Sequence, residues 1–183
     1  ADGATTLDTM ALVADAAGYM LDPRLGLVLD RAAGCELRFT FQLLDEDHAP
    51  SDKDGDGVGD RAGFSVIMLC ADRLGIELGF WPDQAWAQEQ GAAEPPLGRL
   101  FPHAEGAPAD TGAGLVAYTL GIQGDAYALS AGGRAILSGH LRDYTAFDGP
   151  VNPYRTPNFI FLGDDSGSAR ASVRLAHVEL RMA

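Results

Sequence analysis

The feature of this sequence that most restricts its fold is an alternation of apolar and polar residues between positions 35 and 43. The apolar residues occupy every second position: Cys35, Leu37, Phe39, Phe41 and Leu43. Successive side chains of a β-strand point to opposite faces of a sheet, so a period of two indicates a strand with one buried face and one wet face. The sequence therefore predicts a strand here, in a sheet that is covered on one side.

Similar patterns recur along the chain and are separated by turn residues. They cover 64–70, 76–81, 118–122, 127–129, 134–139, 158–162 and 171–180. Residues 64–70 are apolar on both faces, as in a central strand, and Gly75 after them predicts a hairpin with the next segment. The three segments from 118 to 139 predict a meander. The alternation slips at Ala176-His177, which indicates a β-bulge.

Two stretches lack a clear period. Residues 7–17 are rich in alanine and are compatible with either a helix or an opening strand. Residues 82–114 contain five prolines and are expected to form a long irregular segment, of the kind that is usually functional or flexible in compact domains. Many short strands with turns about every 8–12 residues are typical of a β-sandwich. We therefore predict an all-β chain in which residues 1–183 form one domain, an antiparallel β-sandwich.

Composition excludes several classes of partner. The chain of 183 residues carries a formal net charge of −13, so neither nucleic acid nor an anionic membrane surface is expected, because both require Lys and Arg. No apolar run approaches the roughly 18 residues that a membrane-spanning helix needs. The first residues, Ala1-Asp2-Gly3, fit a chain that begins after a cleaved signal peptide. We therefore expect a secreted protein, extracellular or periplasmic, without a transmembrane segment.

Acidic residues and glycines share the segment 52–60, whose sequence is D-K-D-G-D-G-V-G-D. Its carboxylates would repel one another unless a cation lay between them, and Ca²⁺ prefers such oxygen ligands. The predicted calcium ligands are the carboxylates of Asp52, Asp54, Asp56 and Asp60 and the backbone carbonyl of Val58. Gly63 stands where an EF-hand has its closing Glu, and no helical pattern flanks the loop. The other reading is an acidic surface loop without an ion.

Cys35 and Cys70 are the only two cysteines, and both lie in strand-like apolar segments. In an oxidising compartment they are a candidate disulfide that would join neighbouring strands. As buried thiols they would act instead as small apolar residues. There is no C-x-x-C motif, so neither zinc binding nor redox catalysis is indicated. The sequence leaves the disulfide and the two free thiols both open.

Trp81 and Trp86 are the two tryptophans, and Gln84 and Gln88 lie beside them. An aromatic ring stacks on the C–H face of a sugar while nearby amides bind its hydroxyls. These four residues are therefore a candidate ligand-binding site for carbohydrate. The alternative is that one or both rings fill the end of the sandwich, and we favour it for Trp81, which closes a strand pattern.

Recognisable catalytic motifs are missing from the sequence. Neither G-x-S-x-G nor H-E-x-x-H occurs. Retaining glycoside hydrolysis needs two carboxyls about 5–5.5 Å apart, but Glu77 is the lone acid of its strand and Glu105 lies in a proline-rich stretch. The histidines at 48, 103 and 140 have no spacing that demands a metal. No catalytic residue is predicted.

The meander carries a resemblance to a known superfamily. Residues 118–129 read Y-T-L-G-I-Q-G-D-A-Y-A-L and residues 133–139 read G-R-A-I-L-S-G. This pattern resembles the Y-x-L-x-I-x-G-x-x-Y-x-L…G-x-x-L-x-x-G hairpin of concanavalin A-like lectin/glucanase jelly rolls, and residues 173–180 resemble their final strand. The resemblance implies a jelly roll. The retaining glucanases of that superfamily carry E-x-D-x-x-E or E-x-D-x-E on one strand, and neither motif occurs here.

Shorter resemblances point to an extracellular setting. The segment 52–60 resembles the calcium loop of a thrombospondin type 3 repeat. The segments G-D-R-A-G-F-S-V and N-F-I-F-L-G-D-D resemble uncharacterised bacterial secreted proteins that are often surface-anchored.

These observations predict a secreted, calcium-binding, lectin-like module without catalytic activity, which binds carbohydrate or a surface protein partner. Two alternatives stay open. One is a structural subunit of an extracellular protein assembly. The other is a divergent glycoside hydrolase or polysaccharide lyase, for which Glu77 and Glu105 would be the residues to test.

Overall fold

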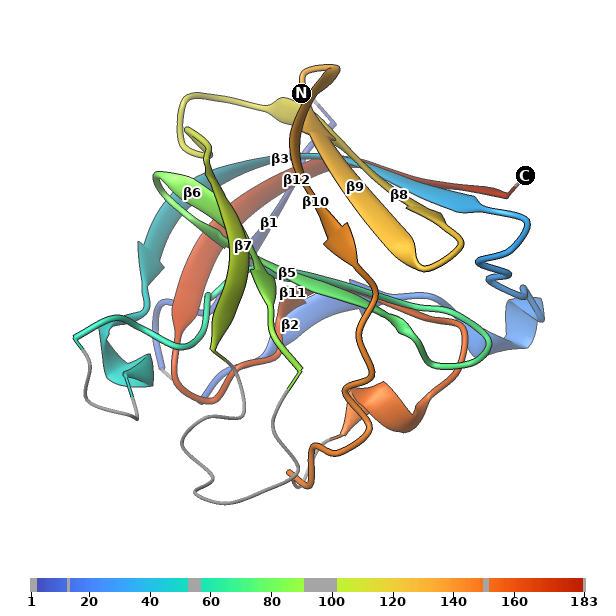
Figure 1. The fold of residues 1–183 in the computed structure, drawn as a ribbon. Coiled ribbons are helices and arrows are strands. Elements are labelled where there is room, and N and C mark those ends of the chain that lie inside the picture. Colours follow the sequence, from blue (N-terminus) through green and yellow to red (C-terminus); the bar gives the residue numbers. More distant parts are fainter. Residues whose placement is uncertain (1–2, 13, 53–56, 91–101, 150–151, 183) are drawn as a thin grey trace.

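The computed structural model describes residues 3–12, 14–52, 57–90, 102–149 and 152–182. These residues form two six-stranded antiparallel sheets that pack face to face, so the predicted β-sandwich is confirmed (Figure 1). In spatial order, sheet A contains β1 (Thr5–Asp8), β12 (Arg170–Met182), β3 (Cys35–Asp47), β8 (Val116–Gln123), β9 (Ala126–Ala131) and β10 (Arg134–His140). Sheet B contains β2 (Ala17–Met20), β11 (Phe159–Asp164), β4 (Ser65–Leu69), β5 (Gly75–Trp81), β6 (Gln84–Gln88) and β7 (His103–Pro108).

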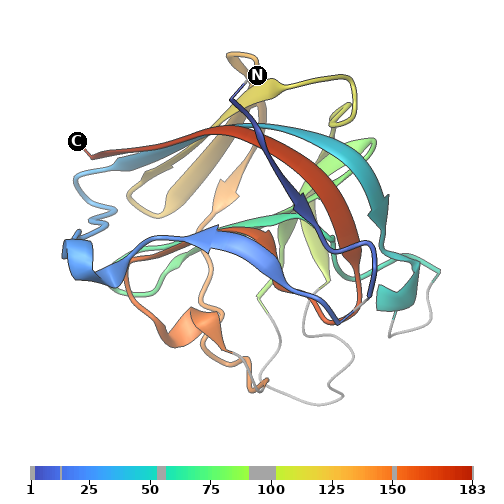
Figure 2. The same ribbon diagram turned by 180° about the vertical axis from the view of Figure 1, so that it is seen from behind.

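Helical structure in the described residues is limited to short 3₁₀ turns, which are η1 (Pro23–Leu25), η2 (Ala49–Ser51) and η4 (Pro153–Arg155). The Ala-rich stretch at 7–17 is therefore not helical where it is described, because β1 ends within it and β2 begins at its last residue. Seen from behind, β2 forms the edge of sheet B beside β11 (Figure 2).

The main core lies between the two sheets and is rich in aromatic rings. Phe41 of β3 packs against Phe64, with ring centroids 4.7 Å apart, and against Phe80 of β5, with centroids 4.9 Å apart. The alternation that predicted β3 has this cause, since every second side chain of that strand enters the core. Burial of these side chains contributes roughly 25 cal/mol for each Å² of apolar surface removed from water.

Several local predictions are confirmed by the strand pairing. β4 and β5 form the predicted hairpin, and β8, β9 and β10 form the predicted meander. The register of β12 against β3 shifts between Leu175 and His177, where the bulge was predicted.

The prediction that residues 82–114 are irregular is wrong for two parts of that segment. β6 and β7 lie inside it and extend sheet B, with Ala85 paired to Ala107. Neither strand had a readable pattern, because β6 is only five residues long and is buried on both faces, and β7 contains Gly106 and Pro108. An edge strand tolerates both residues, since one of its sides needs no hydrogen-bond donors.

Sheet B is covered on both faces, which explains why residues 64–70 are apolar apart from Ser65. Its outer face, turned away from sheet A, packs against the segment between β10 and β11, which we call the covering segment (residues 141–149 and 152–158) (Figure 1). Tyr144 and Tyr154 of this segment pack against Ile67 and Leu69 of β4. Side chains on the outer face of sheet B are therefore buried in a second, smaller core.

At one level of sheet B, glycine or serine stands on every strand except β6, which carries Trp86. The register places the following residues side by side from β2 to β7: Gly18, Gly163, Ser65, Gly79, Trp86 and Gly106. The indole of Trp86 lies over Gly79, where a Cβ atom would be only 2.4 Å from a ring carbon. The glycine at 79 is thus what lets a large ring lie on the sheet.

Candidate functional site

A charged cluster is buried on the outer face of sheet B. Its central residues are Arg61, which is 9% exposed to solvent, and Glu77, which is 2% exposed. Arg61 Nη2 lies 3.3 Å from Glu77 Oε1 and 3.2 Å from Asp165 Oδ1, so one nitrogen bridges two carboxylates. The hydroxyl of Ser65 donates to the same Asp165 oxygen at 3.3 Å. We call Arg61, Glu77, Asp165 and Ser65 the charged cluster.

Two tyrosines of the covering segment close the charged cluster from outside. The hydroxyl of Tyr154 donates to Glu77 Oε2. The hydroxyl of Tyr144 accepts a hydrogen bond from the backbone N–H of Glu77 at 3.2 Å and donates to the carbonyl of Gln88 at 2.7 Å. Both carboxylate oxygens of Glu77 are therefore occupied, one by Arg61 and one by Tyr154.

Burial controls the proton affinity of this cluster. It raises the pKa of Glu77 to about 7, although Arg61 and the hydrogen bond from Tyr154 act in the opposite direction. Burial, the largest single influence, lowers the pKa of Arg61, but the combined attraction to Glu77, Tyr154 and Asp165 outweighs it and the net shift is upward. Arg61 thus stays charged while Glu77 changes its charge near neutral pH.

Two imidazole–indole stacks lie beside the charged cluster. The ring of His48 stacks on Trp81 with centroids 3.9 Å apart, and the ring of His103 stacks on Trp86 with centroids 3.7 Å apart. The two indoles meet edge to face at 5.7 Å. Trp81 also donates its Nε1–H to the carbonyl of Arg61 at 3.2 Å, which joins the stacks to the charged cluster.

The predicted ligand-binding residues thus lie close together, but the two indoles are buried, whereas a sugar-binding surface was expected to expose them. Trp81 and Trp86 are only 5% and 2% exposed, so neither indole offers a bare face to solvent. This placement agrees with the alternative in which the rings pack inside the protein. Gln84 is half-buried and Gln88 is fully buried. The half-buried imidazoles of His48 and His103 cover the indoles, and no pattern in the sequence predicts this position for them.

Two polar atoms of this region stand out because they are buried without a partner. Within the described part of the chain, Trp86 Nε1 and Gln88 Oε1 make no hydrogen bond. The amide nitrogen of Gln88 does have a partner, the carbonyl of Pro102 at 3.5 Å. Buried polar groups are nearly always paired with protein, water or ligand, so these two atoms call for an explanation.

His48 is held by a buried acid. Oε2 of Glu46 lies 2.6 Å from His48 Nδ1, and the N–H of Gly63 donates to the other Glu46 oxygen at 3.3 Å. Burial raises the pKa of Glu46, against the lowering effect of His48. This pair fixes the orientation of the imidazole on Trp81. The sequence shows Glu46 only as part of an acidic run, Asp45-Glu46-Asp47, and gives no sign of this role.

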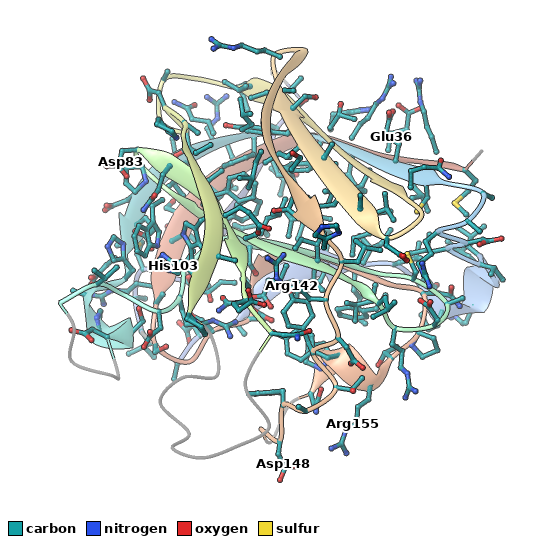
Figure 3. All side chains as sticks on the ribbon, in the orientation of Figure 1. Glu36, Asp83, His103, Arg142, Asp148 and Arg155 are labelled. Carbon is teal, nitrogen blue, oxygen red and sulfur yellow. The ribbon has the colours of Figure 1, made fainter. Side chains whose placement is uncertain are left out.

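A second guanidinium, that of Arg142, joins the two sheets at their β7 and β10 edges. Its Nη2 lies 2.6 Å from Oε2 of Glu105 on β7, and its Nε lies 3.0 Å from Glu89 Oε1. Tyr127 of β9 donates its hydroxyl to the same Glu105 oxygen at 3.2 Å. Figure 3 shows Arg142 where the chain leaves β10 and crosses toward sheet B, and His103 beside β7. Glu105 therefore has one partner in the covering segment, Arg142, and one on sheet A, Tyr127.

The predicted calcium loop is only partly described. Asp54 and Asp56 lie outside the described residues, whereas Asp52, Val58 and Asp60 lie within them. The N–H of Gly57 donates to Asp52 Oδ2 at 3.0 Å, and Gly57 has a φ of +86°, the left-handed turn expected of a loop glycine. The described residues contain no group of three or more His, Cys, Asp or Glu side chains that could hold a metal ion. Calcium binding therefore stays a prediction.

The two cysteines are free, buried thiols. Cys35 begins β3 in sheet A and Cys70 follows β4 in sheet B, so they face one another across the core and are not on neighbouring strands as expected. The neighbouring thiol of Cys70 lowers the pKa of Cys35, so the two side chains lie near one another in the core. The described residues also contain no helix that is both long and apolar enough to cross a membrane.

The two sheets form a jelly-roll β-sandwich. No protein-family model and no curated protein sequence matches the chain. Among solved structures, a carbohydrate esterase from the Shiga toxin-encoding bacteriophage phi24B has a TM-score of 0.59 at 11% identity, over 98% of this chain and 80% of its own. Alginate lyase A1-II', of polysaccharide lyase family 7, has a TM-score of 0.53 at 12% identity, over 100% and 81%. Sheep galectin-11 has a TM-score of 0.51 at 8% identity, over 90% and 97%. At these identities the likeness shows the fold alone.

Proposed function

We propose that this chain is a secreted, lectin-like protein that binds carbohydrate on the outer face of sheet B. The observation that carries the proposal is the burial of Arg61 and Glu77 beside two imidazole–indole stacks. Burying charged groups on a sheet face costs free energy that apolar packing would not, so such groups often mark functional sites. Two neighbours in fold are named for carbohydrate chemistry, but fold does not fix function, so the argument rests on these side chains.

Binding fits the geometry better than catalysis does. A general acid must reach the oxygen that it protonates. Both oxygens of Glu77 already have partners, and its side chain is nearly excluded from solvent. The accessible groups of the site are instead half-buried ones, namely His48, Gln84, His103 and Asp165. Such a rim of amides, imidazoles and a carboxylate supplies hydrogen bonds for sugar hydroxyls.

Binding measurements with matched variants test this proposal. Isothermal titration calorimetry against a panel of oligosaccharides would identify a ligand for the wild-type chain. Asp165→Asn removes a charge at the rim and should weaken binding roughly tenfold, because a charged group gives the stronger hydrogen bonds. Asp83→Asn, at the exposed turn between β5 and β6, is the control and should bind as the wild type does. A panel without any ligand, or equal affinity in both variants, would contradict the proposal.

A second candidate, glycoside hydrolysis, is favoured by one observation. Glu77 and Asp165 meet on one guanidinium nitrogen, and the pKa of Glu77 is raised to about 7, as the acid of such a pair requires. Release of reducing ends from polysaccharides, abolished in Glu77→Gln, would replace the binding proposal with this one. No release from any substrate that binds would leave the binding proposal standing.

Calcium belongs to the proposal as a structural ion. The loop 52–60 leads directly to Arg61, whose N–H donates to Ser51 Oγ at 3.1 Å across the base of the loop. An ion held by this loop would stiffen the backbone that positions Arg61. A calcium loop without an EF-hand's closing Glu is suited to the millimolar Ca²⁺ of an extracellular or periplasmic compartment.

A further inference from the structure

We infer that the ligand of this face is a neutral glycan and not an acidic polysaccharide such as a polyuronate. The inference rests on the proposed function and names the class of carbohydrate that the site accepts. It is drawn from the pairing of the charged groups around the site and from the two buried polar atoms that have no partner.

Among the residues that the structure describes, the two guanidinium groups beside the site, those of Arg61 and Arg142, are already neutralised. Arg61 is paired with Glu77 and Asp165, and Arg142 is paired with Glu89 and Glu105. Each positive charge thus has two acidic partners within hydrogen-bond reach. A polyuronate would have to displace these carboxylates to gain an ion pair, and it would approach a chain of formal net charge −13. A neutral glycan neither has to displace these carboxylates nor is repelled by the negative charge of the chain.

The two buried atoms without a hydrogen-bond partner indicate which chemical group of a ligand would pair with them. Trp86 Nε1 is a donor and needs an acceptor, whereas Gln88 Oε1 is an acceptor and needs a donor. A sugar hydroxyl can accept one hydrogen bond and donate another. An ionised carboxylate only accepts, so at this position it could serve Trp86 but not Gln88 Oε1. The two atoms therefore call for a hydroxyl, and because polyuronates carry hydroxyls as well, the exclusion of acidic glycans rests on the paired guanidinium groups.

The local structure keeps both atoms at one place in the site. Trp86 and Gln88 are two residues apart on β6, so their side chains leave the same face of the strand. His103 of β7 is paired with Gln88 in register and stacks on Trp86. Both atoms are shielded from solvent, so a ligand hydroxyl can reach them only if the half-buried imidazole of His103 moves aside.

The first experiment compares neutral and acidic ligands on the wild-type chain. Calorimetry would use gluco-, manno- and xylo-oligosaccharides against oligomannuronate, oligoguluronate and oligogalacturonate of equal length, in 20 and 500 mM NaCl. We expect binding only to neutral oligomers, with affinity changing less than about twofold between the two salt concentrations, since salt screens charged contacts only. Acidic oligomers that bind and lose more than about tenfold in affinity at high salt would overturn the inference while leaving the proposed function intact. Absence of all binding would refute the proposed function itself.

The second experiment removes the two unpartnered atoms one at a time. Trp86→Phe keeps an aromatic ring and deletes the N–H donor, and Gln88→Met keeps the length of the side chain and deletes the acceptor. Each should weaken binding of a neutral oligosaccharide roughly tenfold. Gln123→Met, exposed on β8 of sheet A, is the matched control and should bind normally. Unchanged affinity in both folded site variants would overturn the inference. If either variant fails to fold, the salt comparison on the wild-type chain still decides the question.

Discussion

Arg61 Nη2 and Glu77 Oε1 are 3.3 Å apart in a place where both side chains are largely shielded from bulk water. This pair connects distant parts of the chain, since Arg61 follows the acidic loop and Glu77 lies in the middle of β5. Desolvation of two charges costs several kcal/mol for each ion, and mutual attraction offsets this only when the remaining hydrogen bonds are also made. Tyr154 and Asp165 make those bonds here.

Removing one partner of this pair should be more damaging than removing both. Arg61→Met leaves Glu77 buried without a counter-charge, so we expect the free energy of unfolding to fall by about 3–5 kcal/mol. In the double variant Arg61→Met/Glu77→Gln the buried carboxylate is gone, and part of the loss should be recovered. Urea denaturation of the four members of this double-mutant cycle measures the coupling. Additive effects of the two substitutions would mean that the pair is not coupled.

Stability should depend on pH because Glu77 holds its proton more tightly when folded. Burial raises its pKa to about 7, whereas an unfolded Glu has a pKa of about 4.3. Between these values the native state binds more protons than the unfolded state, so the free energy of unfolding falls as pH rises. The loss is on the order of 3 kcal/mol. Asp164, whose pKa burial raises to about 6, acts in the same direction.

Thermal unfolding between pH 4.5 and 8 checks this dependence. The melting temperature of the wild type should decrease across the interval. Glu77→Gln cannot titrate, so its profile should be flatter and should retain only the slope due to Asp164 and other acids. Parallel profiles for the two proteins would show that Glu77 does not control the pH dependence.

Strands could be predicted from the sequence where only one of their faces is buried. They could not be predicted where residues from elsewhere in the chain cover the second face as well. The alternation in β3 was readable because the core covers one face of that strand and solvent wets most of the other. In β6 both faces are buried, one by sheet A and one beneath imidazoles from other segments, so no alternation exists to be read. A sequence pattern shows only the local periodicity of apolar residues. Burial by residues that are distant in the sequence does not produce such a periodicity.

The candidate site was largely hidden for the same reason. Glu77 was visible only as a lone acid in a strand whose other residues are apolar or glycine. Its partners Arg61 and Asp165 reach it through the pairing of β4, β5 and β11 and cannot be deduced from spacing. Trp81 and Trp86 were correctly grouped, because they lie on adjacent strands of one hairpin, but the glycine at 79 that lets Trp86 lie flat was not recognised.

The proximity of Cys35 and Cys70 predicts a disulfide under oxidising conditions. Oxidised glutathione would be reduced to two thiols as the Cys35–Cys70 bond forms and links sheet A to sheet B. A cross-link that closes a loop of this length stabilises a protein by about 4 kcal/mol in the chain-entropy description. We expect a higher melting temperature after oxidation, reversed by dithiothreitol, and a bonded peptide pair in mass spectrometry. Cys70→Ala is the control, and its melting temperature should not respond to either reagent.

Under the proposed calcium binding by segment 52–60, Ca²⁺ should stabilise the native state, because this loop has no fixed geometry in the unfolded chain. At a Ca²⁺ concentration of about 100 times the dissociation constant, mass action adds about 2.7 kcal/mol to the free energy of unfolding. The melting temperature should therefore rise when CaCl₂ is added to EDTA-treated protein, and rise less with MgCl₂, which loses its hydration water reluctantly. Asp60→Asn, at a predicted ligand within the described loop, should weaken the response, whereas Asp83→Asn should preserve it. An identical melting temperature with EDTA and with CaCl₂ would show that segment 52–60 is an acidic loop that holds no ion.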